Sequence, residues 1–98
     1  MAYEVIVKKR FANKVIKVLA YLEKEWSQKV AGEFLLKVDR RFNLLKQQPF
    51  VGIPSQKIIG VRGILITRHN KMYYKIEGTK VIILNLYDTR ISPRKNPY

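Results

Sequence analysis

The stretch "IIGVRGILITRHNKMYYKIEGTKVIILNLY" (residues 58–87) predicts three consecutive strands and so decides the fold. Segments 58–67, 72–77 and 80–87 are rich in β-branched and aromatic residues, and short turns separate them. Gly78–Thr79 is a two-residue hairpin loop with glycine first, as a type II′ turn prefers. The last segment is almost wholly apolar, which indicates a central strand. We therefore expect an antiparallel sheet built from two hairpins.

These hairpins also predict which side chains share a face, because directly opposite residues lie on the same side of a sheet. The Gly78–Thr79 loop places Tyr74 opposite Ile83, and we expect Tyr74 to lie in the core. An even-length turn at residues 68–71 would place Arg62 opposite Glu77, where the two could form an ion pair. On this register the face away from the helices carries four candidate functional residues: Arg62, Tyr73, Lys75 and, at its rim, Lys71.

Upstream of the three strands, the spacing of apolar residues predicts a short strand and two helices. Residues 2–8 alternate between the two faces of a strand, and residues 10–25 have the apolar spacing of one helix face. Ser27 can end this helix and cap a second, over residues 28–46, which must end before Pro49. With so few residues between them, the helices should form an antiparallel hairpin.

The predicted order is β-α-α-β-β-β in a single domain over residues 1–98. We expect an α+β, two-layer fold in which the helical hairpin packs on one face of a small, mostly antiparallel sheet. Trp26 and the phenylalanines at helical spacing should lie in the core, and residues 47–56, with two prolines and a glycine, should form a loop. Residues 88–98 are expected to form a basic tail, which is either loose and solvated or the working end of the molecule.

The charge of the chain is strongly positive. Twenty lysines and arginines against seven acids give +13, and no acid occurs between Asp39 and Glu77. This favours a polyanionic partner, either nucleic acid or an acidic protein segment. The chain has no cysteine, which excludes disulfides and thiolate metal sites. It shows no signal pattern and no membrane-spanning run, so we expect a cytoplasmic protein without a membrane partner.

Two longer phrases carry a resemblance to a known family. The phrase "YLEKEWSQKVAGEFLLKVDRRFNLLKQQPFVG" (21–52) ends in Leu-x-x-x-Pro-x-x-Gly, and "GVRGILITRHNKMYYKIEGTKVIILNLYDTR" (60–90) has a basic residue after a small turn, a mid-strand tyrosine and an arginine past the last strand. Together with the element order, they resemble the RelE/ParE superfamily, the toxins of bacterial type II toxin–antitoxin pairs. The resemblance implies the fold predicted above, a cognate antitoxin protein as partner and no cofactor or metal.

This resemblance implies two possible functions. RelE-like toxins are ribosome-dependent, metal-independent endoribonucleases that cut mRNA and block translation, whereas ParE-like toxins bind DNA gyrase and poison it without cutting RNA. We favour the mRNA endoribonuclease, with the ribosome and mRNA as partners, and keep the gyrase inhibitor as the alternative. The segment after Arg90 departs from RNA-cleaving relatives, because it has no histidine and only one tyrosine, Tyr98.

The ribonuclease interpretation assigns a role to each candidate residue by resemblance. The predicted catalytic residues are Arg62, Lys71 and Arg90. Arginine suits this chemistry, because its planar fork binds phosphate oxygens and stabilises the charge that develops on them. The predicted RNA-binding residues are Arg68, Tyr73, Lys75, Arg94 and Lys95. His69 and Tyr98 are candidates for proton transfer, although a histidine in a turn and basic residues in a tail are commonly just solvated.

Overall fold

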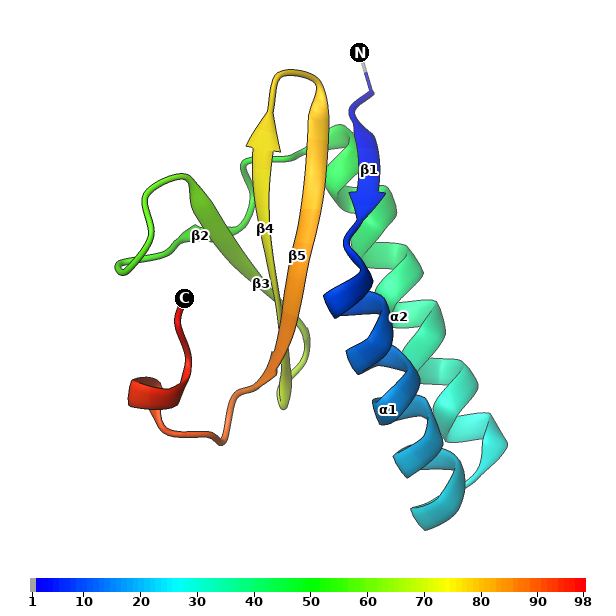
Figure 1. The fold of residues 1–98 in the computed structure, drawn as a ribbon. Coiled ribbons are helices and arrows are strands. Elements are labelled where there is room, and N and C mark those ends of the chain that lie inside the picture. Colours follow the sequence, from blue (N-terminus) through cyan, green and yellow to red (C-terminus); the bar gives the residue numbers. More distant parts are fainter. Residues whose placement is uncertain (1) are drawn as a thin grey trace.

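The computed structural model describes residues 2–98 and has two layers (Figure 1). The elements in chain order are β1 (Glu4–Val7), α1 (Lys9–Glu25), α2 (Gln28–Gln47), β2 (Ile53–Pro54), β3 (Val61–Thr67), β4 (Asn70–Glu77), β5 (Lys80–Asp88) and the 3₁₀ turn η1 (Pro93–Lys95). The strands form one sheet in the order β1-β5-β4-β3-β2, in which only β1 and β5 run parallel. The predicted α+β fold is confirmed. In the described part of the chain, neither helix is long and apolar enough to cross a membrane.

The helical hairpin covers one face of the sheet, and its far end extends beyond the strands (Figure 1). The Ser27 hydroxyl accepts a hydrogen bond from the Val30 amide at 3.1 Å, so Ser27 caps α2 as predicted. Trp26 is 70% exposed, and the prediction that it lies in the core is wrong. The apolar spacing of α1 continues to Trp26, but this residue lies where the helix has passed the edge of the sheet.

Tyr74 lies at the centre of the core and contacts the proline and the glycine of the Leu-x-x-x-Pro-x-x-Gly phrase. Its ring is fully buried, as is Leu45 at the end of α2. The Tyr74 hydroxyl donates to the Pro49 carbonyl at 2.7 Å and accepts from the Gly52 amide at 2.9 Å. A Cβ at Gly52 would lie 2.4 Å from that hydroxyl oxygen, so the position requires glycine. Burial raises the pKa of Tyr74, which keeps the hydroxyl protonated.

The β4–β5 hairpin follows the predicted register over most of its length. Tyr74 lies opposite Ile83, and Gly78 has φ 59°, as the first position of the predicted turn requires. A bulge next to Tyr74 shifts the remaining pairs, so that Met72 lies opposite Leu86 and not opposite Asn85.

The β3–β4 register differs from the prediction for two reasons. The turn has two residues, Arg68 and His69, instead of four, and a bulge between Leu65 and Thr67 shifts the pairing by one further residue. Arg62 therefore lies opposite Tyr74, three positions before the predicted Glu77. A shift by an odd number of residues exchanges the two faces of a strand. As a consequence, Ile66 is buried in the core, and the expected ion pair between Arg62 and Glu77 is wrong.

Candidate functional site

Arg62, one of the three predicted catalytic residues, lies on the face of the sheet that the helices cover. It is directly opposite Tyr74, whose side chain is in the core. Its guanidinium donates to the main-chain oxygens of Phe50 (3.1 Å) and Gly52 (2.8 Å), and it lies 5.2 Å from the centre of the Phe50 ring. Arg62 thus holds the loop after α2 against the sheet. The prediction that it shares the open face with Lys71 is wrong.

Lys71 lies on the open face, the face that the helices do not cover. It is opposite Tyr87, and its amine lies 5.5 Å from the centre of the Tyr73 ring. Lys75 alternates onto the same face and forms an ion pair with Glu77 at 2.9 Å. The structure therefore brings Lys71, Tyr73 and Lys75 to one face.

The C-terminal segment (residues 91–98) folds back on the sheet on the side opposite the helices (Figure 1). The Tyr98 ring stacks on Tyr73, with the ring centres 4.8 Å apart and 18° between the planes. The side-chain amide of Asn96 donates to the Tyr73 hydroxyl at 3.0 Å. The Lys57 amine donates to two main-chain oxygens of the segment. The basic tail is thus a packed element with tertiary contacts.

This packing changes what the open face offers to a ligand. Beneath the segment lies a hollow of about 300 Å³, whose lining includes Lys57, Lys71, Tyr73, Tyr87 and Tyr98. Tyr98 already occupies one face of the Tyr73 ring, so an RNA base can stack there only after the segment moves. The predicted RNA-binding residues Arg94 and Lys95 lie in η1 and point their charges toward solvent rather than into a shared pocket with Lys71.

A second surface lies between α1 and the β3–β4 turn, and we call it the α1 cleft. It has a volume of about 540 Å³ and is lined by Lys17, Val18, Tyr21, Leu22, Trp26, His69, Asn70, Asp88 and Arg90. Trp26 and Tyr21 are 70% and 59% exposed. Sequence reasoning missed the α1 contribution, although the position of Trp26 beside the Ser27 cap indicates the exposed tip of a hairpin.

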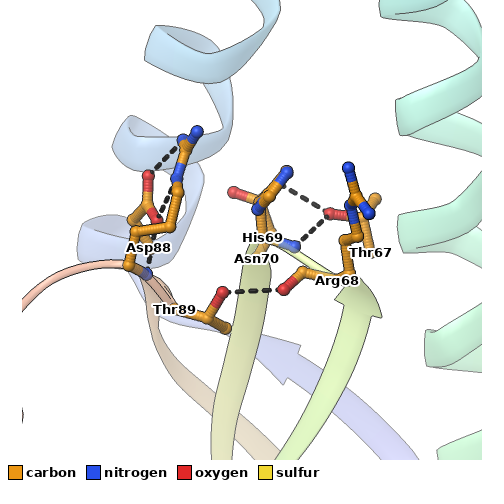
Figure 2. A network of polar contacts seen from close by, with 7 residues as sticks. Thr67, Arg68, His69, Asn70, Asp88 and Thr89 are labelled. Atoms are coloured by element: carbon orange, nitrogen blue, oxygen red, sulfur yellow. Dashed lines mark hydrogen bonds and ion pairs between the residues drawn. The ribbon is translucent and has the colours of Figure 1, made fainter.

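Polar contacts fix the strand side of the α1 cleft (Figure 2). The Thr67 hydroxyl accepts hydrogen bonds from the His69 amide (3.2 Å) and from the Asn70 side chain (2.9 Å). The Thr89 hydroxyl donates to the Arg68 carbonyl at 2.7 Å. The bonds to Thr67 hold the β3–β4 turn together, and the bond from Thr89 joins this turn to the end of β5. The cleft therefore has a rim that is fixed by hydrogen bonds.

Arg90 and Asp88 form the charged part of the rim. Asp88 accepts from the Arg90 side chain at Nε (2.9 Å) and Nη2 (2.7 Å), and from the Arg90 amide at 2.8 Å. The hydrogen bonds from the Arg90 side chain, followed by the one from its amide, lower the pKa of Asp88 to about 2. The carboxylate is therefore ionised at neutral pH and fills one edge of the guanidinium fork.

No protein-family profile and no curated protein sequence matches this chain. Solved structures do match its fold. A chain of the ParDE toxin–antitoxin system of P. aeruginosa aligns with a TM-score of 0.77 at 16% identity, over 89% of this chain and 96% of that one. The RelBE2 toxin–antitoxin complex of Mycobacterium tuberculosis gives 0.63 at 18% identity, over 90% and 99%. The YoeB/ParE toxin of Agrobacterium tumefaciens gives 0.65 at 12% identity, over 87% and 96%. The chain has the RelE/ParE toxin fold.

Within this RelE/ParE fold, the predicted catalytic residues occupy three separate places. Arg62 lies against the loop after α2, Lys71 lies on the open face, and Arg90 lies in the α1 cleft together with His69. The catalytic and RNA-binding roles themselves remain predictions. Among residues 2–98, no group of three or more His, Cys, Asp and Glu side chains is placed to hold a metal ion.

Proposed function

We propose that this chain is the toxin of a type II toxin–antitoxin pair and that it arrests growth by binding a protein target, DNA gyrase, without cutting mRNA. The separation of the three predicted catalytic residues is the observation that carries the proposal. Metal-free RNA cleavage needs preorganised donors that converge on one phosphate as charge develops there. Arg62 is engaged by loop carbonyls on the face that the helices cover, Lys71 lies on the opposite face of the sheet, and Arg90 lies in the α1 cleft.

The surface suits a protein-binding role. The chain carries +13, and its α1 cleft combines exposed aromatic rings with cations. Such a surface attracts acidic protein segments, both from the target and from the antitoxin that neutralises the toxin. Gyrase is the proposed target because ParE-like toxins, whose fold this chain shares, act on that enzyme.

A second candidate, mRNA cleavage on the ribosome, is favoured by one specific observation. The α1 cleft brings together Arg90 and His69, a phosphate-binding and a proton-transfer candidate, next to Trp26 and Tyr21. Exposed aromatic rings can stack on bases, which contributes about 1–3 kcal/mol per base. If this chain cuts RNA, we expect His69 and Arg90 to act in this cleft.

Controlled expression in bacteria separates the two functions. We expect growth arrest with early induction of an SOS reporter, while incorporation of labelled amino acids continues. The diagnostic variant is His69→Gln, which should keep the DNA-damage response if no RNA is cut. An immediate block of amino-acid incorporation without SOS induction, relieved by His69→Gln, would overturn the proposal and establish the ribonuclease.

A further inference from the structure

We propose that the α1 cleft is the surface that docks the target, and that it takes a protein segment with one aromatic or aliphatic anchor beside carboxylates. The inference rests on the proposed function and assigns that function to a place on the molecule. Three properties of the cleft support this role: its composition, the distribution of its charge and the hydrogen bonding of its rim.

The helix side of the cleft has the composition of a binding hot spot. Tyr21 and Trp26 expose most of their surface above Val18 and Leu22, which line the cleft between them and the sheet. Tryptophan, tyrosine and arginine dominate the binding energy of protein interfaces, because each presents a large contact area. A volume of about 540 Å³ admits one large side chain with its neighbouring backbone.

The charges of the cleft select an acidic segment. Among the described residues that line the cleft, Asp88 alone is acidic, and the Arg90 side chain already satisfies it. The Arg90 side chain is 66% exposed, and Lys17 lies on the facing helix. A carboxylate that enters the cleft therefore meets two cations. Four apolar or aromatic side chains line the same space, which favours a protein segment over an RNA backbone, since RNA needs a track of cations.

The rim of the cleft is preorganised, which reduces the entropic cost of docking. Hydrogen bonds to Thr67 hold the β3–β4 turn together, and the Thr89 hydroxyl fixes this turn against the end of β5 (Figure 2). The bidentate contact with Asp88 fixes the direction of Arg90. A partner thus meets a cation that is already held in place, and it loses little affinity to ordering this side of the cleft.

Trp26 provides a direct probe, because it is the only tryptophan in the chain. Protein labelled with 5-fluorotryptophan gives one ¹⁹F resonance, which is titrated with three probes: the peptide Glu-Glu-Phe-Glu-Glu, its Glu-Glu-Ala-Glu-Glu counterpart and an octauridylate RNA. We expect a saturable shift with the phenylalanine peptide and at least a tenfold weaker response to the other two probes. A response to RNA alone, or to none of the probes, would overturn the inference.

Variants then connect the cleft to the target. We expect Trp26→Ala and Tyr21→Ala each to weaken binding to purified gyrase at least tenfold, and Ile16→Ala to leave it unchanged. Ile16 is a matched control, because it lies on α1, is 62% exposed and is not part of the cleft lining. Circular dichroism establishes that each variant is folded.

A wrong target and a wrong docking surface give different results. If the wild-type chain does not bind gyrase but the phenylalanine peptide shifts Trp26, the target is wrong and the docking surface stands. If the wild-type chain binds gyrase and both aromatic variants bind equally well, the docking surface is wrong and the proposed function stands.

Discussion

Replacing Gly52 with alanine tests the link between the loop after α2 and the core. The new Cβ would lie 2.4 Å from the Tyr74 hydroxyl oxygen and 2.8 Å from its Cε1 atom. The ring is fully buried, and two hydrogen bonds hold its hydroxyl in place. Two hydrogen bonds are strained or lost at about 0.5–1.5 kcal/mol each, and overpacking adds about 1–3 kcal/mol. We therefore expect Gly52→Ala to lower the free energy of unfolding by about 2–6 kcal/mol.

Urea denaturation and thermal melting measure this change, and a loss of this size lowers the Tm of a domain this small by at least about 8 °C. Gly32→Ala is the matched control, because Gly32 lies within α2 and a Cβ there meets nothing within 4 Å. It should stabilise the chain by about 0.5–1 kcal/mol, as alanine does when it replaces a helical glycine. A Gly52→Ala variant as stable as the wild type would refute the role of the Tyr74 contact.

Three further changes test separate elements. Ser27→Ala removes the cap of α2 and should cost about 1 kcal/mol in urea denaturation, and an unchanged midpoint would contradict the capping contact. Tyr98→Ala removes the stack on Tyr73 and should cost about 0.5–1.5 kcal/mol, with changed NMR signals from Tyr73, and unaltered signals would show that the segment is not packed there. Because the folded-state pKa of Asp88, about 2, lies below its ordinary 3.8, the contact with Arg90 stabilises the fold above about pH 4 and is lost as the pH falls through 2. A ¹³C titration of the Asp88 carboxyl should therefore have its midpoint near 2, and near 3.8 in Arg90→Ala, whereas equal midpoints would rule out the contact.

Local signals made the helical hairpin predictable. Ser27 marks the boundary between the helices, and Pro49 marks the end of the second, because capping and proline geometry depend on near neighbours in the chain. The positions of β3, β4 and β5 along the chain followed from their composition. The register next to Gly78 followed from the type of turn. In each case the physical cause lies within a few residues of its effect.

Long-range packing made the rest unpredictable. The β3–β4 turn was placed two residues too long and the bulge between Leu65 and Thr67 was missed, and together these errors exchanged the faces of β3 and moved Arg62 to the wrong side. The C-terminal segment looked solvated, but Lys57 and Tyr73 hold it from distant parts of the chain. Its prolines do not prevent a helical turn, because Pro93 lies in the first turn of η1, where its fixed φ fits.

Candidate residues on the strand side of the α1 cleft were predicted from the sequence, and those on the helix side were not. Arg90 was a candidate through the resemblance, as the arginine past the last strand, and His69 was a candidate as the only histidine; the structure brings both into one cleft. Trp26 was missed, because apolar spacing predicts which side of a helix faces the core but not how far the sheet reaches beneath it. The length of α1 relative to the sheet decides that this tryptophan is exposed.

The most direct test of the account is a supercoiling assay with purified gyrase and the purified chain, compared with Trp26→Ala. We predict that the wild-type chain inhibits supercoiling, and that the variant needs at least a tenfold higher concentration for the same effect. If the wild-type chain leaves gyrase fully active and instead cuts mRNA on programmed ribosomes, the proposal that it acts by binding a protein target is wrong.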